Sequence, residues 1–575
     1  MQKRWNIRKY NDELRRKIYE LSNILNIKPL TAALLINRGI DEEEKARTFL
    51  FPKIDDLHDP FLLKDADKAT ARILKAISRR EKVLIWGDYD VDGTTGTVLL
   101  RKALKYLGLD VDFHIPHRIH DGYGIRRDRL EQIKKDGYTL VISTDTGSTA
   151  LEAGQWANEN GLDLIVTDHH KLDKDQERPF FALVNPNQHD CPYPNKHLAG
   201  VGVAFKIAQA VLSRANYAQK SKVISELLEL TALGTIADIM ELAGENRTIV
   251  ALGLQNLSDT RQVGLRALME IAGCLDEIDS YRVGFQIAPR INAAGRLADA
   301  SEVIELFETE SYEKALNLAR GLDTKNRERQ KLQETAVNEA IRMVEKEKQN
   351  NKVLVVASPD WHRGIVGLVA ARLVERFYRP SVAISISEGV AYGSARSPDW
   401  FDISEGLAAC ADVLTKWGGH SKAAGFTLPE KDICSLESII NAYALRRFAE
   451  ELFVPTIEIE AAVKFSTIDF QLYVELRKME PFGLGNPRPL FVTRSVHLAD
   501  KPYVLKDKHL KLVLRDADGY KHWAIWWNGV EKLEEKGIDV CKLESSAIDV
   551  AYRLDTRDFG SQIKIQLLIE DIRIS

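Results

Sequence analysis

The stretch KVLIWGDYDVDG, residues 82–93, decides the fold of the first half of the chain. Its opening residues, 82–86, form the short apolar run of a buried strand, and three aspartates at alternate positions follow almost at once. Helical patterns flank this stretch at residues 66–80 and 94–108. A strand enclosed by two helices is the repeating unit of an α/β sheet.

The same alternation continues along the chain. Strand-like runs recur at residues 111–115, 139–143, 163–167 and 181–186, and helical patterns separate most of them. This rhythm predicts an α/β lobe with a parallel, doubly wound sheet over residues 68–305. In such sheets ligands bind outside the carboxyl ends of the strands, so residues that directly follow a strand are the first candidates for chemistry.

The remaining sequence divides into four further regions, because 575 residues are too many for one core and suggest three to five domains. We expect an N-terminal region, a long charged connecting helix, a second α/β lobe and a small, strand-rich antiparallel barrel. Their expected ranges are 1–67, 306–350, 351–454 and 455–575.

Composition excludes several classes of protein. With 45% hydrophobic and 29% charged residues the chain is not mainly disordered. Its five cysteines form no CxxC motif, which argues against a disulfide framework and a zinc knuckle, and no apolar run approaches the roughly 20 residues that span a bilayer. We therefore expect a cytoplasmic protein that does not bind membranes. The net charge of −4 does not exclude nucleic acid, because a local basic groove suffices for binding.

Acids and imidazoles gather where the predicted strands end. Three carboxylates as close as those of GDYDVDG repel one another unless a cation binds, although alone they would also suit a solvated turn or a calcium-like loop. Oxygen ligands with one or two imidazoles suit Mn²⁺ or Mg²⁺, and two such ions would activate a water and stabilise the leaving oxygen of a phosphodiester. The residues concerned are Asp88, Asp90, Asp92, Asp145, Asp168, His169 and His170, and Asp238, which follows a helical segment, is a further candidate.

In that order, the segments DYDVDG, DTG, DHH and GTIAD resemble the four motifs of the DHH phosphoesterase superfamily. The resemblance implies that Asp90, Asp145, His169 and Asp238 hold one metal, and that Asp145 bridges to a second ion, which Asp88 also binds. With His170, which would orient the site or contact the scissile phosphate, the first four form the expected catalytic set. Asp92 and Asp168 would fix ligands by accepting hydrogen bonds. Trp86 is a departure, because several superfamily members have a metal-binding histidine there, so the second site is expected to be poor in ligands.

The second α/β lobe carries segments for substrate binding. GSARS and WGGHSKAAGFTL resemble the DHH-associated domain, DHHA1, in which glycines let backbone approach a phosphate and arginine offers a forked donor. Arg290 lies in the apolar segment FQIAPRINAAGRL, where either a phosphate or an internal carboxylate would compensate its charge. The expected substrate-binding residues are Arg290, Ser394, Arg396, Gly419 and His420.

Over nearly its whole length the chain resembles the RecJ family of single-strand-specific DNA exonucleases, notably in APRINAAGRL, WHRGIVGLVAARL and MEPFGLGNPRPLF. That resemblance implies hydrolysis of single-stranded DNA from its 5′ end to mononucleotides with two Mn²⁺ or Mg²⁺ ions, in recombination and repair. It also implies that Arg290, Ser394, Arg396 and His420 grip the 5′ phosphate, and that the partners include a single-strand-binding protein and repair helicases. The last domain would be an OB-like barrel.

Two other functions stay open at this stage. A superfamily phosphodiesterase for short oligoribonucleotides or cyclic dinucleotides would use the same two lobes, and a single-strand-binding protein could retain a decayed site. In the barrel, Tyr520, Trp523, Trp526 and Trp527 could stack on bases. Alternation places Trp523 and Trp527 on one face and Trp526 on the other, so at least one of them is expected in the core.

Overall fold

The computed structural model describes residues 3–118, 124–172, 178–297, 299–448, 454–559 and 562–574. The chain forms two compact units, residues 1–6 with 323–457 and residues 7–322 with 458–575, and each is described by itself. Within the described residues, no helix is both long and apolar enough to cross a membrane.

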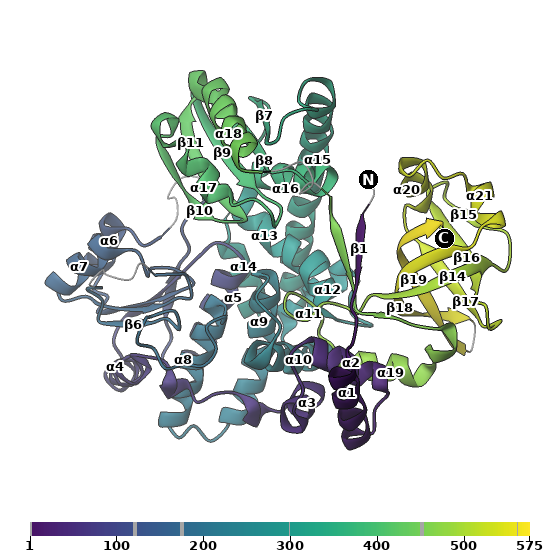
Figure 1. Ribbon diagram of the computed structural model, residues 1–575. Helices are drawn as coiled ribbons and strands as arrows, with labels where there is room; N and C mark the ends of the chain where they lie inside the picture. The colour runs from purple at the N-terminus through teal and green to yellow at the C-terminus, as the bar shows by residue number, and fades with distance from the viewer. Residues whose placement is uncertain are drawn as a thin grey trace. The chain divides into compact units, whose positions relative to one another are not determined.

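The first lobe, residues 66–308, is built on a parallel sheet (Figure 1). The strand order is β3-β2-β4-β5-β6, and every neighbouring pair is parallel, as the alternating pattern predicted. Strand β3 lies on one side of β2 and β4 lies on the other, so the direction of the strand order reverses at β2. The connecting helices therefore cover both faces of the sheet. The strands are β2 (Val83–Gly87), β3 (Asp112–His114), β4 (Leu140–Thr144), β5 (Asp163–Thr167) and β6 (Ala182–Val184).

Strand alternation divides the apolar side chains of this sheet between two cores. Ile85, Ile142 and Ile165 belong to a large core with helices α4 (Ala66–Arg79), α5 (Val91–Tyr106) and α8 (Gly200–Arg214). Their neighbours along the strands, Leu84, Val141 and Leu164, belong to a smaller core with α6 (Arg127–Lys135) and α7 (Leu151–Glu159). Because both faces are covered, the central strands β2, β4 and β5 are buried along almost their whole length, and their carboxyl ends are the places available for polar chemistry.

Helices complete the first lobe and lead out of it. They include a π-helical turn, η3 (Val283–Ile287), between α12 and α13. The expected long charged helix is α15 (Tyr312–Glu347), with 36 residues. The others are α9 (Lys220–Ala237), α10 (Gly244–Ser258), α11 (Val263–Ala272), α12 (Ser280–Arg282), α13 (Ala288–Leu297) and α14 (Ser301–Glu308).

The second lobe is a mixed α/β layer of five strands in the order β10-β11-β9-β8-β7. Only β7 and β8 are parallel. Helix α16 and the C-terminal half of α15 pack on one face, and α17 and α18 contribute to the core on the other. The elements are β7 (Leu354–Ser358), α16 (Val366–Phe377), β8 (Ser381–Ser387), β9 (Val390–Arg396), α17 (Ile403–Ala408), β10 (Lys416–His420), β11 (Ala423–Pro429) and α18 (Ile433–Arg447).

The C-terminal domain is a closed barrel, because β14 pairs with both β18 and β16 and thereby joins the two ends of the sheet. Two pairs of this sheet are parallel, β17 with β19 and β13 with β14, so the barrel is not purely antiparallel as the pattern predicted. Strand β12 (Thr456–Ile459), before the barrel, pairs with β1 (Arg4–Ile7) in a separate two-stranded sheet. The elements of the barrel domain are β13 (Ala461–Ala462), α19 (Phe470–Lys478), β14 (Phe491–Leu498), β15 (Tyr503–Leu505), β16 (His509–Arg515), β17 (Lys521–Trp526), α20 (Gly529–Glu535), α21 (Val540–Ser545), β18 (Ile548–Phe559) and β19 (Gln562–Ile574).

The N-terminal helices share the core of this barrel. Leu34 and Leu35 are fully buried in one cluster with Leu472 and Trp526. The side chain of Glu475 accepts hydrogen bonds from the backbone N–H of Lys28 at 2.9 Å and from the hydroxyl of Thr31 at 2.5 Å. The N-terminal elements are β1 (Arg4–Ile7), α1 (Asp12–Leu25), α2 (Pro29–Asn37) and α3 (Glu43–Leu50).

The barrel separates the four aromatic candidates. Trp526 is completely buried in the core, whereas Tyr520, Trp523 and Trp527 are 54%, 42% and 48% exposed. Register explains the difference, since Trp526 pairs with the core residue Leu510 and Trp523 lies on the opposite face of β17. The expectation that at least one tryptophan belongs to the core is confirmed.

Candidate metal centre

The carboxyl edge of the parallel sheet brings the predicted acids and imidazoles together. Asp88 follows β2, Asp145 follows β4 and His169 follows β5 closely, while Asp238 directly follows α9. Within each of three groups, the ligand atoms lie within 4.8 Å of one another. The groups are Asp88, Asp90 and Asp145; Asp92, His169 and Asp238; and Asp145, His169 and His170.

Asp145 lies at the centre of this arrangement and has an unusual backbone. Its φ of 62° is in the left-handed region, and its N–H donates to the carbonyl of Thr167 at 3.0 Å. A Cβ at Gly200 would lie only 2.5 Å from the Cβ of Asp145, so the start of α8 can approach only because this residue is glycine. The carboxylate of Asp145 is 3.2 Å from His169 Nε2.

Asp92 connects two helices beneath the site. Its two carboxylate oxygens accept hydrogen bonds from the backbone N–H groups of Gly200 and Val201, both at 2.7 Å, at the start of α8. One of these oxygens also lies 3.9 Å from His169 Nε2. Helix α5 begins at Val91, earlier than the predicted helical pattern at residues 94–108, and Asp90 caps it by accepting from the N–H of Gly93 at 3.0 Å. A cap favours an acid, since the first N–H groups of a helix lack helical partners.

Asp168 holds the two histidines in place. One of its oxygens accepts from the N–H of His169 at 2.7 Å and contacts Nδ1 of His170 at 2.7 Å, and the other accepts from the N–H of Ser148 at 2.9 Å. Burial alone would raise the pKa of Asp168, but these hydrogen bonds and the charge of His170 lower it below its usual range. Asp168 therefore stays ionised, and the pKa of His170 rises to about 9, although burial acts against that rise.

The carboxylates of the site are buried close together, which makes their ionised forms unfavourable. Burial, and then the neighbouring carboxylates, raise the pKa values of Asp88 and Asp145 well above the usual range, that of Asp92 to about 7 and that of Asp238 to about 8. The pKa of His169 falls to about 4, chiefly because its ring is buried, so this imidazole is neutral and able to ligate a metal.

An oxygen of Asp88 that lacks a hydrogen-bond partner also indicates a cation site, independently of the pKa values. The buried oxygen Oδ1 of Asp88 accepts no hydrogen bond in the described part of the chain. A buried carboxylate oxygen without a partner is costly, and a divalent cation would satisfy it. The residues present therefore suit hard, oxygen-seeking ions such as Mn²⁺ or Mg²⁺.

The observed grouping differs from the one that the superfamily motifs implied. Asp90 lies with Asp88 and Asp145, whereas Asp92, expected only to accept hydrogen bonds, lies with His169 and Asp238. Trp86, at the position of the missing histidine, is buried and meets the ring of His114 edge to face at 4.5 Å. It offers no ligand atom, and the Asp88 side of the site has carboxylates alone.

Sequence reasoning missed two asparagines that support the histidines. Asn185 donates to the carbonyl of His170 at 3.0 Å, and Asn187 donates to the carbonyl of His169 at 2.6 Å. Asn185 follows β6 directly and Asn187 lies two residues further on, as the acids follow β4 and β5. The same rule of strand ends could have identified them, because polar residues after a buried strand lie at the ligand edge of the sheet.

The second lobe aligns its candidate residues on one face of its sheet. Across β10, β11 and β9, His420 pairs with Ala423 and Ala423 with Arg396, while Gly425 pairs with Ser394. Directly paired residues and residues two apart share a face, so Ser394, Arg396 and His420 lie on the same side. Arg396 donates to the hydroxyl of Ser394 at 2.9 Å.

Two glycines shape this face. A Cβ at Gly367, in the first turn of α16, would lie 3.0 Å from Arg396 and 3.1 Å from Ser394. Gly419 has a φ of 153°, and a Cβ there would lie 2.4 Å from the carbonyl oxygen of Ala423. Arg290 belongs to the other unit, where it donates to the carbonyl of Gln286 at 2.5 Å.

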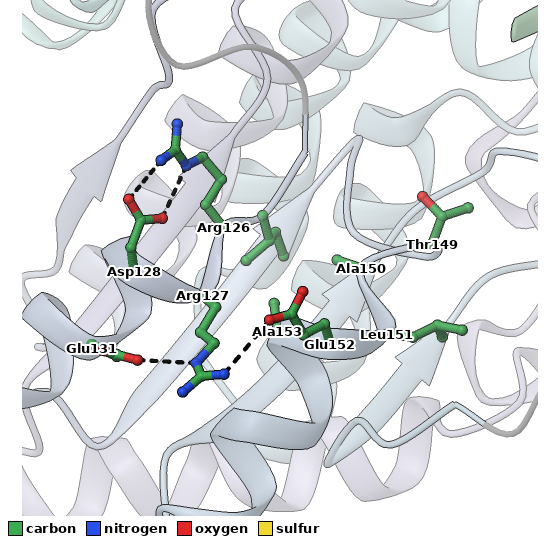
Figure 2. A pocket seen from close by; sticks show the side chains of 10 residues that line it. Arg126, Arg127, Asp128, Glu131, Thr149, Ala150, Leu151, Glu152 and Ala153 are labelled. Carbon is green, nitrogen blue, oxygen red and sulfur yellow. Dashed lines mark hydrogen bonds and ion pairs between the residues drawn. The ribbon is translucent and has the colours of Figure 1, made fainter. Parts of the chain in front are cut away.

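Two hollows lie near the first lobe's functional edge. The smaller, about 540 Å³, lies between the N-termini of α6 and α7 (Figure 2). Its arginines already have acidic partners, Arg126 with Asp128 and Arg127 with Glu131 and Glu152, so we assign it no substrate. The larger cleft, about 1340 Å³, lies between the residues that follow α9 and the outer side of the barrel.

Three family descriptions match consecutive parts of the chain: "DHH family, N-terminal domain" at residues 82–235, "DHHA1 domain" at 350–446 and "RecJ OB domain" at 459–571. The single-stranded-DNA-specific exonuclease RecJ of Bacillus subtilis (strain 168) is 39% identical over 578 residues, covering 100% of this chain and 71% of the relative. The chain belongs to the RecJ family.

Other members of the RecJ family agree in sequence and in fold. The RecJ exonuclease of Haemophilus influenzae is 30% identical over 97% of this chain and 98% of its own length. The crystal structure of RecJ from Thermus thermophilus in complex with Mn²⁺ superposes with a TM-score of 0.84 at 28% identity, covering 100% of this chain and 80% of that one. The same RecJ is also known in complex with Mg²⁺, with a TM-score of 0.78. The fold class and the family expected from the sequence are therefore confirmed.

Proposed function

We propose that this RecJ-family chain is a metal-dependent exonuclease that hydrolyses single-stranded DNA from the 5′ end to mononucleotides. The observation that carries the proposal is the cluster of buried Asp88, Asp92 and Asp145 with partly buried His169 and Asp238 at the carboxyl edge of the sheet. Its relatives are single-stranded-DNA-specific exonucleases, and a RecJ relative binds Mn²⁺ and Mg²⁺.

Asp145 is proposed as the bridging ligand because it belongs to two of the three groups. It would join an ion held by Asp88 and Asp90 to one held by His169, and Asp238 and Asp92 lie within reach of the latter. When bound, the two ions supply activation of the attacking water and neutralisation of charge on the leaving oxygen. The protein's own contribution is to hold the ligands rigidly, which the hydrogen bonds of Asp92 and Asp168 accomplish.

The roles of the remaining residues follow from their placement. Asp168 holds His170 through Nδ1 at 2.7 Å, and we assign the other ring nitrogen of His170 to a phosphate oxygen of the substrate. Arg290, Ser394, Arg396, Gly419 and His420 are proposed to bind the 5′ phosphate. Ser394, Arg396 and His420 are supported by the shared sheet face and Gly419 by its close approach to the backbone of Ala423, whereas Arg290 rests on the family resemblance alone.

The setting of the reaction is also part of the proposal. We expect the chain to work in the cytoplasm, where thiols stay reduced, and the described cysteines Cys191, Cys274, Cys410 and Cys434 are all free. A single-strand-binding protein and repair helicases are proposed as partners from the family resemblance alone.

Product analysis on one oligonucleotide tests the function. Single-stranded DNA labelled at either end would be incubated with Mn²⁺, Mg²⁺ or chelator, beside an RNA copy and a duplex. We expect immediate release of a labelled mononucleotide from the 5′ end, a shortening 3′-labelled ladder and a spared duplex. Cleavage of short RNA with inert DNA would instead indicate a small phosphodiesterase, and tight binding without cleavage would indicate a decayed site.

The Asp145→Ala variant tests the metal assignment. We expect loss of cleavage with an unchanged circular dichroism spectrum, because Asp145 contributes to both proposed metal sites. Asp110→Ala removes an exposed acid of the same lobe and serves as the matched control. Near-normal cleavage by the Asp145→Ala protein would refute the assignment.

A further inference from the structure

Two aromatic side chains of the first lobe are exposed where apolar residues are normally buried. Tyr281 is 63% exposed and Phe285 is 68% exposed. Their rings lie against each other with centroids 4.6 Å apart and planes inclined by 32°. Exposed aromatic surface on this scale commonly marks a binding site, because it is unfavourable to leave in water.

The short helical segment that carries the pair is fixed to its surroundings. Asp279 caps α12 by accepting from the N–H of Arg282 at 2.7 Å, and the hydroxyl of Ser280 donates to the carbonyl of Phe482 at 2.5 Å. Phe285 lies in the π-helical turn η3, a conformation often found at functional sites. The two rings therefore project from an anchored base.

This aromatic pair is close in the fold to the metal centre. The turn η3 packs against the end of α9, where a Cβ at Gly284 would lie 3.8 Å from the side chain of Ile236. Asp238 of the metal cluster lies two residues further along the chain, and the next residue, Ile239, is 70% exposed. Tyr281, Phe285 and Ile239 all line the larger cleft, as does Ala237, so the cleft includes the residues on either side of Asp238.

The charge of the cleft suits bases better than phosphates. Its lining contains four arginines and four acids, so its net charge is near zero, and the pKa of Glu480 is raised to about 7 by burial. A groove that tracks the phosphate backbone would carry an excess of cations. On the barrel side the lining includes Trp527, 48% exposed, which adds another aromatic surface.

We propose that Tyr281 and Phe285 form a stacking platform for unpaired bases of the DNA strand, on the catalytic lobe itself and beside Asp238. This inference rests on the proposed function and deepens it. Only an unpaired base can stack on a protein ring, because a base inside a duplex is already stacked between its neighbours. The platform would therefore contribute to the selection of single strands. The strand's phosphates would face solvent, since the four arginines that line the cleft are paired with acids.

Steady-state kinetics on single-stranded DNA of about 20 nucleotides, longer than the 4–16 nucleotides that one OB domain covers, provide the test. Phe285→Ala and Tyr281→Ala should raise KM by about 5- to 100-fold, as expected for the loss of a stacked base, and leave kcat within about twofold. Phe285→Trp should keep a near-normal KM because it keeps a ring. Tyr19→Ala, which removes a 61% exposed tyrosine from α1 outside the cleft, is the matched control.

Abasic substrates separate stacking from a structural effect. If one base stacks on Phe285, removing that base from the strand should weaken binding to the wild-type protein as much as Phe285→Ala weakens binding of the intact strand. Combining the abasic strand with Phe285→Ala should weaken binding little further. Anisotropy of a labelled strand in chelator gives the same comparison as a dissociation constant without cleavage. Equal losses on intact and abasic strands, or KM values like that of Tyr19→Ala, would overturn the inference while the exonuclease function stands. If the wild-type protein neither cleaves nor binds single strands, both proposals fail.

Discussion

Asp92 and Asp145 illustrate how single residues serve both the fold and the proposed chemistry. Asp92 uses both carboxylate oxygens to accept from the N–H groups that begin α8, and it still lies 3.9 Å from His169 Nε2. Asp145 adopts a left-handed backbone that glycine or asparagine would tolerate more easily. Such strain is typical of functional positions, where surrounding structure over-determines an unfavourable conformation.

At the same scale, Asp238 should make the stability of the metal-free protein depend on pH. Burial and the carboxylates of Asp92 and Asp90 raise its folded-state pKa to about 8, whereas its unfolded value is about 4. Its stabilising contribution is therefore complete below pH about 4 and is lost as the pH rises toward 8. In chelator, the melting temperature of wild type relative to Asp238→Asn should fall by roughly 2–4 °C between pH 6 and pH 9.

Differential scanning fluorimetry measures this difference directly. Saturating Mn²⁺ should remove this pH dependence of the melting temperature, since the cation and the protons compete for the same carboxylates. A parallel pH dependence of the two proteins in chelator would show that Asp238 is not electrostatically coupled to the cluster.

Among the elements, the start of α8 is the part on which the metal centre depends most. Gly200→Ala would place a Cβ 2.5 Å from the Cβ of Asp145, so Asp145 or the start of α8 must shift and the ligand geometry changes. We expect at least a tenfold loss of cleavage and weaker Mn²⁺ binding by calorimetry, since positional errors near 1 Å are costly in catalysis.

Gly202→Ala is the matched control two residues further along the same helix. Its Cβ would meet only the side chain of Leu198, at 3.3 Å, and alanine favours helix. The prediction fails if the two variants cleave DNA equally well.

The elements also show what the sequence could and could not predict. The strands ending before Asp145 and Asp168 were predictable, because buried parallel strands are continuous apolar runs and their ends hold the polar residues. The contact of Asp92 with α8 was not predictable, since it joins residues 108 positions apart through backbone N–H groups that have no sequence signature. Alternation placed Trp526 opposite Trp523, but only the closed barrel determines that the face of Trp526 is the inner one.

For the whole molecule, the N-terminal helices and the C-terminal barrel should unfold together. They share one buried cluster, and Glu475 binds α2 through Lys28 and Thr31. Removal of residues 1–50 should therefore expose part of the barrel core to water. Each large apolar side chain that is buried there contributes about 1.5–3 kcal/mol to the free energy of unfolding, so the barrel should be destabilised.

Hydrogen exchange with mass spectrometry tests this coupling. In the truncated protein, amides of β16 and β17 should lose protection, while those of β2, β4 and β5 should keep it. Unchanged protection of β16 and β17 would show that the barrel is stable without the N-terminal helices.

The shared core also sets an order for events during synthesis. Leu34 and Leu35 leave the ribosome long before Leu472 and Trp526, the partners that bury them. At about 5–20 residues per second, the more than 400 intervening residues take on the order of 20–90 s to appear. During that interval the N-terminal helices expose apolar surface to the cell, so the nascent chain is a natural client for chaperones, and its first helices can dock only after the last domain has been made.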